Sequence, residues 1–168
     1  KIGRQTNPWK SNCLSLGLSS GFLEPLESTG LGLTINQISL FIQLLKKNEY
    51  NYNSIDIASY NNKITERYDD IFNFILMHFI FTNRIDTPYW KYINKKNPVS
   101  PQLKKMTKEI NKKGITGLRS FYKHLVYLHN EIFGYKSFES IAIGFELFND
   151  IYKKSDNFNK NISKDPFK

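Results

Sequence analysis

Residues 21–30 read Gly-Phe-Leu-Glu-Pro-Leu-Glu-Ser-Thr-Gly, and this stretch places two carboxylates and two hydroxyls at the start of a predicted helix. Pro25 fixes its own φ and disfavours helical backbone for the residue before it, so we expect Glu24 to lie in a loop. Glu27 and Ser28 follow just as the helix begins. This combination is typical of a reaction site, although acids also stabilise helix starts by about 0.3–1 kcal/mol without any ligand.

The start of this helix is a predicted anion site. Ser28 or Thr29 can act as the N-cap, and Gly30 has no side chain to shield the backbone. The first N–H groups of a helix have no partner within it, and the helix dipole favours negative charge there. We therefore expect the amides of Thr29, Gly30 and Leu31 to be free and accessible to an anion or a cofactor.

The rest of the sequence predicts a mainly helical fold. A short strand is expected at 12–16, and residues 48–62, rich in Asn, Ser and Tyr, are interpreted as a loop with at most one turn of structure. A longer helix is expected over 64–82, nearly apolar all round in its middle. Between the strand and the loop, apolar residues at helical spacing predict an amphipathic helix: Leu31, Ile35, Ile38, Ile42 and Leu45.

Three more helices are expected towards the end of the chain. Ser100 and Pro101 mark the start of one, and Gly114 follows its end. The other two are predicted at 117–133 and 137–152. Before them, Asp86 or Thr87 followed by Pro88 indicates a turn, which Tyr89 and Trp90 anchor by packing.

The composition is typical of one globular unit. The chain has 168 residues, of which 40% are hydrophobic and 15% aromatic, enough to bury one core. A single cysteine, Cys13, excludes an internal disulfide; we expect it to pack in the short strand of a cytoplasmic protein. No apolar stretch is long enough to cross a bilayer, so no membrane partner is expected. His124 and His129 lack a third ligand at a suitable spacing, so we expect no metal.

The net charge of +9 raises the question of a nucleic-acid partner. Lysines between residues 104 and 113 surround a predicted helix whose inward stripe is Leu103, Met106 and Ile110. That pattern indicates a solvated face, and the bias of the whole chain towards Lys, Asn and Ile needs no anionic partner. We expect no nucleic-acid partner, and a non-catalytic basic helical binding module stays an alternative.

Two separated stretches resemble the flavin-dependent halogenases typified by tryptophan halogenase. Residues 12–30, Asn-Cys-Leu-Ser-Leu-Gly-Leu-Ser-Ser followed by the stretch quoted first, are similar to that family's strand, turn and helix start at the flavin. Tyr-Asp-Asp-Ile-Phe at 68–72 and His-Phe at 78–79 resemble its downstream helix. Arg-Ile-Asp-Thr-Pro-Tyr-Trp at 84–90 resembles the motif that ends this region. The stretches occur in the family's order.

This resemblance implies the C-terminal portion of a longer enzyme. Its short strand and loop would complete an FAD-dependent monooxygenase-like α/β fold, but the Gly-x-Gly-x-x-Gly loop of the nucleotide-binding part is absent from these residues. The upstream lysine that handles hypohalous acid in the family is missing too, so we expect no turnover by these residues alone. Within a single unit, 1–30 would form the strand and flavin/halide loop, 31–152 the helical substrate side, and 153–168 a polar tail.

The resemblance also implies an activity. The family uses reduced FAD, dioxygen and a halide ion, chloride or bromide, to halogenate an aromatic substrate such as tryptophan or another indole. A separate flavin reductase supplies the reduced flavin. A related flavin-dependent monooxygenase that hydroxylates its substrate stays an alternative, although the match at residues 27–30 favours halogenation.

The site residues follow from the same matches. Glu27 matches the family's carboxylate beside the lysine and substrate, and Ser28 matches its polar neighbour, so both are catalytic candidates. Thr29 and Gly30 match the positions whose amides hold the halide. The remaining candidates are Gly17, Ser20, Gly21 and Leu31 for the cofactor, and Phe121, Tyr122 and Phe133 for the substrate, where core packing is the alternative.

Overall fold

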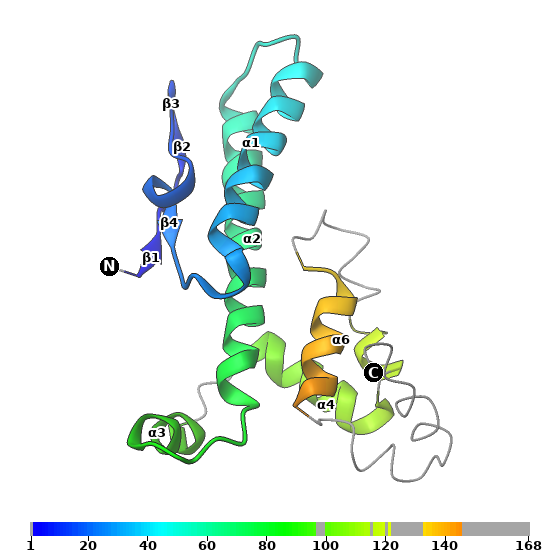
Figure 1. The fold of residues 1–168 in the computed structure, drawn as a ribbon. Coiled ribbons are helices and arrows are strands. Elements are labelled where there is room, and N and C mark those ends of the chain that lie inside the picture. The colour runs from blue at the N-terminus through cyan, green and yellow to red at the C-terminus, as the bar shows by residue number, and fades with distance from the viewer. Residues whose placement is uncertain (1, 97–99, 115, 120, 122–132, 146–168) are drawn as a thin grey trace, which may run out of the picture. The chain divides into compact units, whose positions relative to one another are not determined.

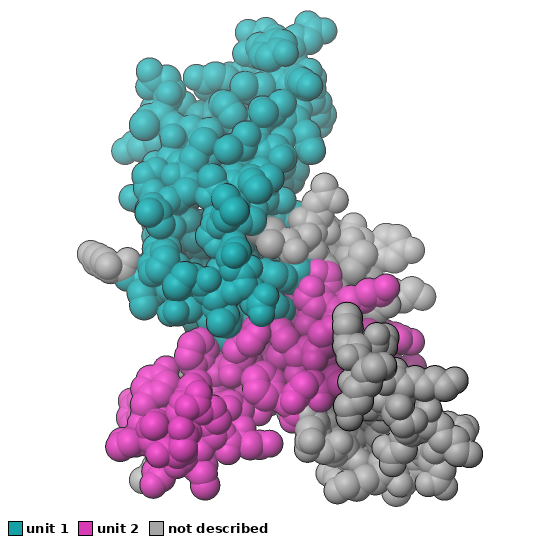
Figure 2. Space-filling view, in the orientation of Figure 1, with its two compact units in different colours: residues 1–75, 130–133 teal, residues 76–129, 134–168 magenta. Residues whose placement is uncertain are grey.

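The computed structural model describes residues 2–96, 100–114, 116–119, 121 and 133–145. They are mainly helical, as expected (Figure 1). The chain divides into two compact units, coloured teal and magenta in Figure 2. Unit 1 comprises residues 1–75 and 130–133, and unit 2 comprises residues 76–129 and 134–168.

Unit 1 begins with four two-residue strands and two short turns of 3-10 helix. The strands pair in two antiparallel ribbons, with Gly3 opposite Phe22 in one and Trp9 opposite Leu14 in the other. β3 lies within the expected strand at 12–16, but its Cys13 is exposed rather than packed. The elements are β1 (Gly3–Arg4), β2 (Trp9–Lys10), β3 (Cys13–Leu14), η1 (Gly17–Ser19), β4 (Gly21–Phe22) and η2 (Leu26–Ser28).

Two long helices lie side by side, to the right of these ribbons in Figure 1. α1 runs over Thr29–Lys47 and α2 over Ser54–Ile80. The prediction of a loop with at most one turn of structure at 48–62 is wrong, because α2 begins at Ser54. Asn53 caps that helix: its Oδ1 accepts from the amide of Asp56 at 3.1 Å, and the Asp56 carboxylate accepts from the Asn53 amide at 3.0 Å.

An aromatic cluster joins the ribbons to the helices. The buried Trp9 ring lies 5.1 Å from Phe41 of α1 and 5.5 Å from Tyr60 of α2, both edge to face. Asn61 of α2 holds the same strand, since its side chain accepts from the Trp9 amide and donates to the Trp9 carbonyl, both at 2.9 Å. These contacts fix β2 onto α2 and form part of the core of unit 1.

The packed face of α1 is opposite to the one that the periodicity suggested. Thr29, Leu33 and Gln37 are buried, whereas the predicted stripe from Leu31 to Ile42 is exposed. α1 carries apolar side chains on both faces, and Leu33 continues on the packed face with Leu40, Phe41 and Leu44, which are half-buried. A single periodic stripe could not show which of two apolar faces meets the rest of this chain.

The described part of unit 2 includes the end of α2 and the helices α3 (Pro88–Lys96), α4 (Pro101–Lys113) and α6 (Tyr135–Gly144). Ser100 caps α4 by accepting from the Leu103 amide at 3.1 Å, and Gly114 ends it with φ 59°, both as predicted. The predicted inward stripe of α4 is buried and therefore confirmed: Leu103, Met106 and Ile110.

Other predictions for unit 2 were less accurate. Pro88 is the first residue of α3 rather than part of a turn, as is common for a proline at the first helical position. α6 covers part of the helix predicted at 137–152, whose remainder lies outside the described residues. Most of the helix predicted at 117–133 also lies outside them, although 116–119 and 121 are helical. Where the structure describes the chain, its helices are too short or too polar to span a membrane.

Candidate functional site

A cavity of about 450 Å³ opens at the start of α1 in unit 1. Its wall is mostly the stretch from η1 to the first turns of α1, and Tyr68 and Ile71 of α2 complete it. Cavities of this size accommodate small organic ligands. Six residues predicted from the sequence as site residues line it: Gly17, Gly21, Ser28, Thr29, Gly30 and Leu31.

The two catalytic candidates occupy strained backbone. Glu27 has φ 55° and ψ 26°, and Ser28 has φ 55° and ψ 28°, both left-handed. Non-glycine residues in such conformations cost about 1–3 kcal/mol each and cluster at functional sites. Ser28 lines the cavity, whereas Glu27 is exposed and does not line it. The strained turn thus directs neighbouring side chains to different surroundings.

The amides at the helix start differ from one another. The N–H of Thr29 donates to the carbonyl of Leu26, so the prediction that this amide is free is wrong. The buried Thr29 hydroxyl donates to the carbonyl of Glu24 at 2.8 Å and ties the loop to the helix. Gly30 is open: a Cβ added there would meet no heavy atom within 4 Å. The accessible part of the helix start is therefore at Gly30.

Gln37 organises the wall of the cavity, and sequence reasoning missed it. Its fully buried side chain accepts from the Gly17 amide at 3.0 Å and donates to the Ser20 hydroxyl at 2.7 Å. The Tyr60 hydroxyl donates to the backbone carbonyl oxygen of Gln37 at 3.3 Å. The predicted cofactor residue Ser20 is thus buried against Gln37 and does not line the large cavity. The predicted helix also contains Gln43, so the sequence carried no signal that singled out Gln37.

Tyr68 lies beneath the cavity and was also missed. A Cβ added at Gly21 would stand 2.6 Å from the Tyr68 hydroxyl and 2.8 Å from the Arg4 Cα, so close packing requires glycine at 21. Burial raises the pKa of the Tyr68 hydroxyl, while Ser20, Arg4 and Gln37 act in the opposite direction. The hydroxyl has no hydrogen-bond partner of ordinary geometry among the described residues.

The two substrate candidates that the structure describes pack within their own units, and Phe133 is only half-buried. Phe121 is buried in unit 2. Phe133 belongs to unit 1 and stacks on Phe74 with ring centroids 3.9 Å apart. Tyr122 lies outside the described residues. A substrate role for these three side chains stays a prediction.

The Arg84–Trp90 motif of the resemblance forms a local cluster in unit 2. Arg84 makes a two-point contact with Asp86 at 3.1 and 2.8 Å, and its guanidinium lies 4.8 Å from the centre of the Trp90 ring. The ion pair raises the pKa of Arg84 and lowers that of Asp86. Trp90 also packs against Phe79 with ring centroids 6.0 Å apart, whereas Tyr89 is exposed. This arrangement explains the motif structurally: it anchors the segment that leads into α3.

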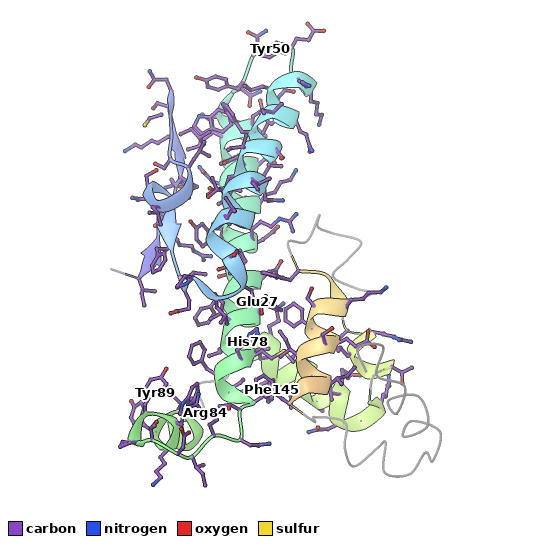
Figure 3. The ribbon with its side chains drawn as sticks, viewed as in Figure 1. Glu27, Tyr50, His78, Arg84, Tyr89 and Phe145 are labelled. Carbon is purple, nitrogen blue, oxygen red and sulfur yellow. The ribbon has the colours of Figure 1, made fainter. Side chains whose placement is uncertain are left out.

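The described residues offer no metal centre, since no three of their His, Cys, Asp and Glu side chains gather to hold an ion. His78 packs its ring edge to face against Phe145, with ring centroids 6.4 Å apart (Figure 3). His124 and His129 lie outside the described residues.

Comparison with known proteins identifies the family. The tryptophan halogenase family profile matches residues 1–159, so the chain belongs to the tryptophan halogenase family. Tryptophan 7-halogenase RebH of Lentzea aerocolonigenes is 39% identical over 92 residues, which are 54% of this chain and 17% of RebH. Tryptophan 6-halogenase ThaL of Streptomyces albogriseolus is 36% identical over 93 residues, again 54% of this chain and 17% of the relative.

Solved structures agree with the sequence relatives. A flavin-dependent halogenase from Xanthomonas campestris superposes with a TM-score of 0.73 at 28% identity, over 87% of this chain and 27% of the other. The tryptophan 6-halogenase SttH from Streptomyces toxytricini gives 0.67 at 26% identity, over 84% of this chain and 26% of the other. The chain therefore spans about a quarter of the length of these solved relatives. The predicted family is confirmed.

Proposed function

We propose that this chain forms the halide and carboxylate side of a flavin-dependent halogenase, as the C-terminal part of a longer FAD-dependent monooxygenase-like fold. The reaction would use reduced FAD, dioxygen and chloride or bromide to halogenate an aromatic substrate such as tryptophan or another indole. The observation that carries the proposal is the cavity at the start of α1, because six predicted site residues line it.

The cavity suits the flat ring of a flavin. Its wall combines glycine backbone with apolar side chains such as Leu18, Phe22 and Pro25, a surface on which an aromatic ring system can lie. Gly17, Gly21 and Leu31 would hold the ring. Ser20 would act indirectly, because its hydroxyl already accepts a hydrogen bond from Gln37. When bound, reduced flavin with dioxygen supplies the two-electron oxidation that turns halide into an electrophilic halogen.

The open backbone at Gly30 would hold the halide. The Gly30 and Leu31 amides belong to the first turn of a 19-residue helix, whose dipole favours an anion there. Thr29 would contribute its amide only if the hydrogen bond to Leu26 opened. Ser28, which lines the cavity, is placed to contact a bound ligand.

Glu27 would act on the organic substrate. As a carboxylate it can orient an ammonium group, or accept the proton that leaves the ring after the halogen has bonded to carbon. Its exposed position leaves the side chain accessible to a second surface bearing the substrate and the upstream lysine. The nucleotide-binding loop and that lysine would come from the longer polypeptide, and a separate reductase would supply reduced flavin.

A fused enzyme tests this proposal. The chain replaces the matching region of RebH, and the fusion is assayed with bromide, a flavin reductase and tryptophan or indole, with products detected by mass spectrometry. We expect brominated product, and a loss of about 100-fold or more in rate for Glu27→Gln, the usual range for losing general acid–base catalysis. Glu109→Gln, which removes a partly exposed carboxylate near Lys113 of α4, serves as the matched control.

Two results would count against the proposal. A fusion that binds FAD but yields only hydroxylated product would favour the related monooxygenase. Equal bromination rates for Glu27→Gln and Glu109→Gln would remove Glu27 from the chemistry.

A further inference from the structure

Thr34 lies in the second turn of α1, on the wall of the cavity. Its hydroxyl donates to the carbonyl oxygen of Gly30, four residues earlier, at 2.8 Å. The same oxygen is the acceptor that α-helical bonding assigns to the backbone N–H of Thr34. The Gly30 carbonyl therefore accepts hydrogen bonds from both the backbone and the side chain of one residue.

The Thr34 side chain is held in place by a neighbour in η1. A Cβ added at Gly17 would stand 3.3 Å from the Thr34 hydroxyl oxygen and 3.7 Å from its methyl carbon, so Gly17 packs directly against Thr34. Thr34 is half-buried, and a β-branched side chain has few rotamers open to it in a helix. Contact with Gly17 on one side thus keeps the hydroxyl against the Gly30 carbonyl on the other.

The carbonyl that Thr34 binds belongs to a peptide unit of the proposed halide site. The Gly30 carbonyl and the Leu31 N–H are the two ends of this unit, and both residues line the cavity. Leu31 is the third residue of α1, so its N–H is one of those that α-helical bonding leaves without a partner. A hydrogen bond accepted at one end of a peptide unit polarises it and strengthens the donor at the other end by about 10–30%.

We propose that Thr34 is a positioning residue for the halide, because its hydroxyl fixes and polarises the peptide unit between Gly30 and Leu31. The Leu31 N–H then donates more strongly to the ion. This inference rests on the proposed function, which places the halide at these amides. A threonine hydroxyl often bonds the carbonyl four residues earlier in a helix, so the bond by itself is ordinary. At Thr34 it acts on a donor at the start of a helix, beside a cavity.

Thr107 of α4 provides a matched control. Its hydroxyl donates to the Leu103 carbonyl at 2.8 Å, the same bond over the same number of residues. The N–H of that peptide unit belongs to Lys104 and already donates to the Ser100 carbonyl at 2.9 Å. Thr107→Val therefore removes the same hydroxyl and the same hydrogen bond from a helix, but at a peptide unit whose N–H is occupied.

Bromide binding by the fusion with RebH tests the inference, measured by the broadening that a protein-bound ion gives to the bromide NMR signal. We expect Thr34→Val to weaken binding about two- to fourfold, since the remaining hydrogen bonds lose only part of their strength. Thr34→Ser retains the hydroxyl and should restore the wild-type affinity, and Thr107→Val should leave the affinity unchanged. Wild-type affinity in Thr34→Val, an equal loss in Thr107→Val, or no recovery in Thr34→Ser would overturn the inference.

A second measurement uses the 168-residue chain without any halide. With nitrogen-labelled leucine, the amide signal of Leu31 reports on hydrogen bonding at the Gly30 carbonyl. Thr34→Val should move the Leu31 amide proton upfield, because its N–H becomes less polarised, and Thr107→Val should leave it in place. A Leu31 signal that stays in place in Thr34→Val would overturn the inference. Thr34→Ala replaces the valine variant in both measurements if valine prevents folding.

The inference and the proposed function can fail separately. A fusion that brominates its substrate and binds bromide equally well with and without the Thr34 hydroxyl would overturn the inference alone. A fusion that binds bromide less well in Thr34→Val but forms no halogenated product would contradict the proposed function and leave the role of Thr34 standing.

Discussion

Replacing Gln37 with leucine should destabilise unit 1 while leaving its size and helical content nearly unchanged. The substitution removes the hydrogen bonds to Gly17 and Ser20, at 3.0 and 2.7 Å, and leaves the Gly17 amide and the Ser20 hydroxyl without this partner. An unsatisfied buried polar group costs about 1–3 kcal/mol, and Gly17 is only half-buried, so we expect a loss of about 2–4 kcal/mol. Leucine is apolar and similar in volume, so the loss comes from hydrogen bonding rather than from a cavity.

The assay is urea unfolding followed by the fluorescence of Trp9, which is buried in unit 1. Trp90 belongs to unit 2, so Trp90→Phe in every variant isolates the signal. Adding Ser20→Ala to Gln37→Leu removes the stranded hydroxyl and should recover about 1 kcal/mol, because deleting both partners costs less than deleting one. A change below about 0.5 kcal/mol for Gln37→Leu, the usual range of neutral surface substitutions, would refute the reasoning.

Two further predictions concern the packing beneath the cavity. Gly21→Ala should cost about 1–3 kcal/mol in the same assay, because its Cβ would stand 2.8 Å from backbone atoms of Gly3 and Arg4; an unchanged midpoint would contradict the packing. Burial raises the pKa of Tyr68 above its ordinary value of 10.0, so the unfolded chain loses this proton first as the pH rises. Stability from this group is therefore full below pH 10 and lost as the pH climbs beyond it. Tyr68→Phe should therefore reduce the fall in the free energy of unfolding between neutral and alkaline pH. A fall as steep as in the wild type would contradict this role of Tyr68.

The sequence predicted the local features that short-range chemistry determines. Ser100 and Gly114 bound α4 as expected, because a hydroxyl cap and a left-handed glycine act within a few residues. Asn53 caps α2 by the same short-range chemistry. The Asn, Ser and Tyr residues around it nevertheless led to the prediction of a loop where this helix begins. The site residues around Gly30 came together because they adjoin one another in sequence.

Features that depend on tertiary packing could not be predicted from the sequence pattern. Both faces of α1 carry apolar side chains, and only the packing of Leu33 and Gln37 shows which one meets the rest of unit 1. Tyr68 reaches the cavity from a helix far from Gly21 in sequence, so only the fold places its hydroxyl beside Gly21. The left-handed backbone of Glu27 and Ser28 is a similar case, since neither residue type favours it.

The most direct measurement is the location of bromide in crystals of the chain fused to the remainder of RebH, using the anomalous scattering of the ion. The account predicts a peak within hydrogen-bonding distance of the Gly30 amide nitrogen, beside the flavin. A fused enzyme that brominates its substrate while the bromide lies away from the start of α1 would contradict it.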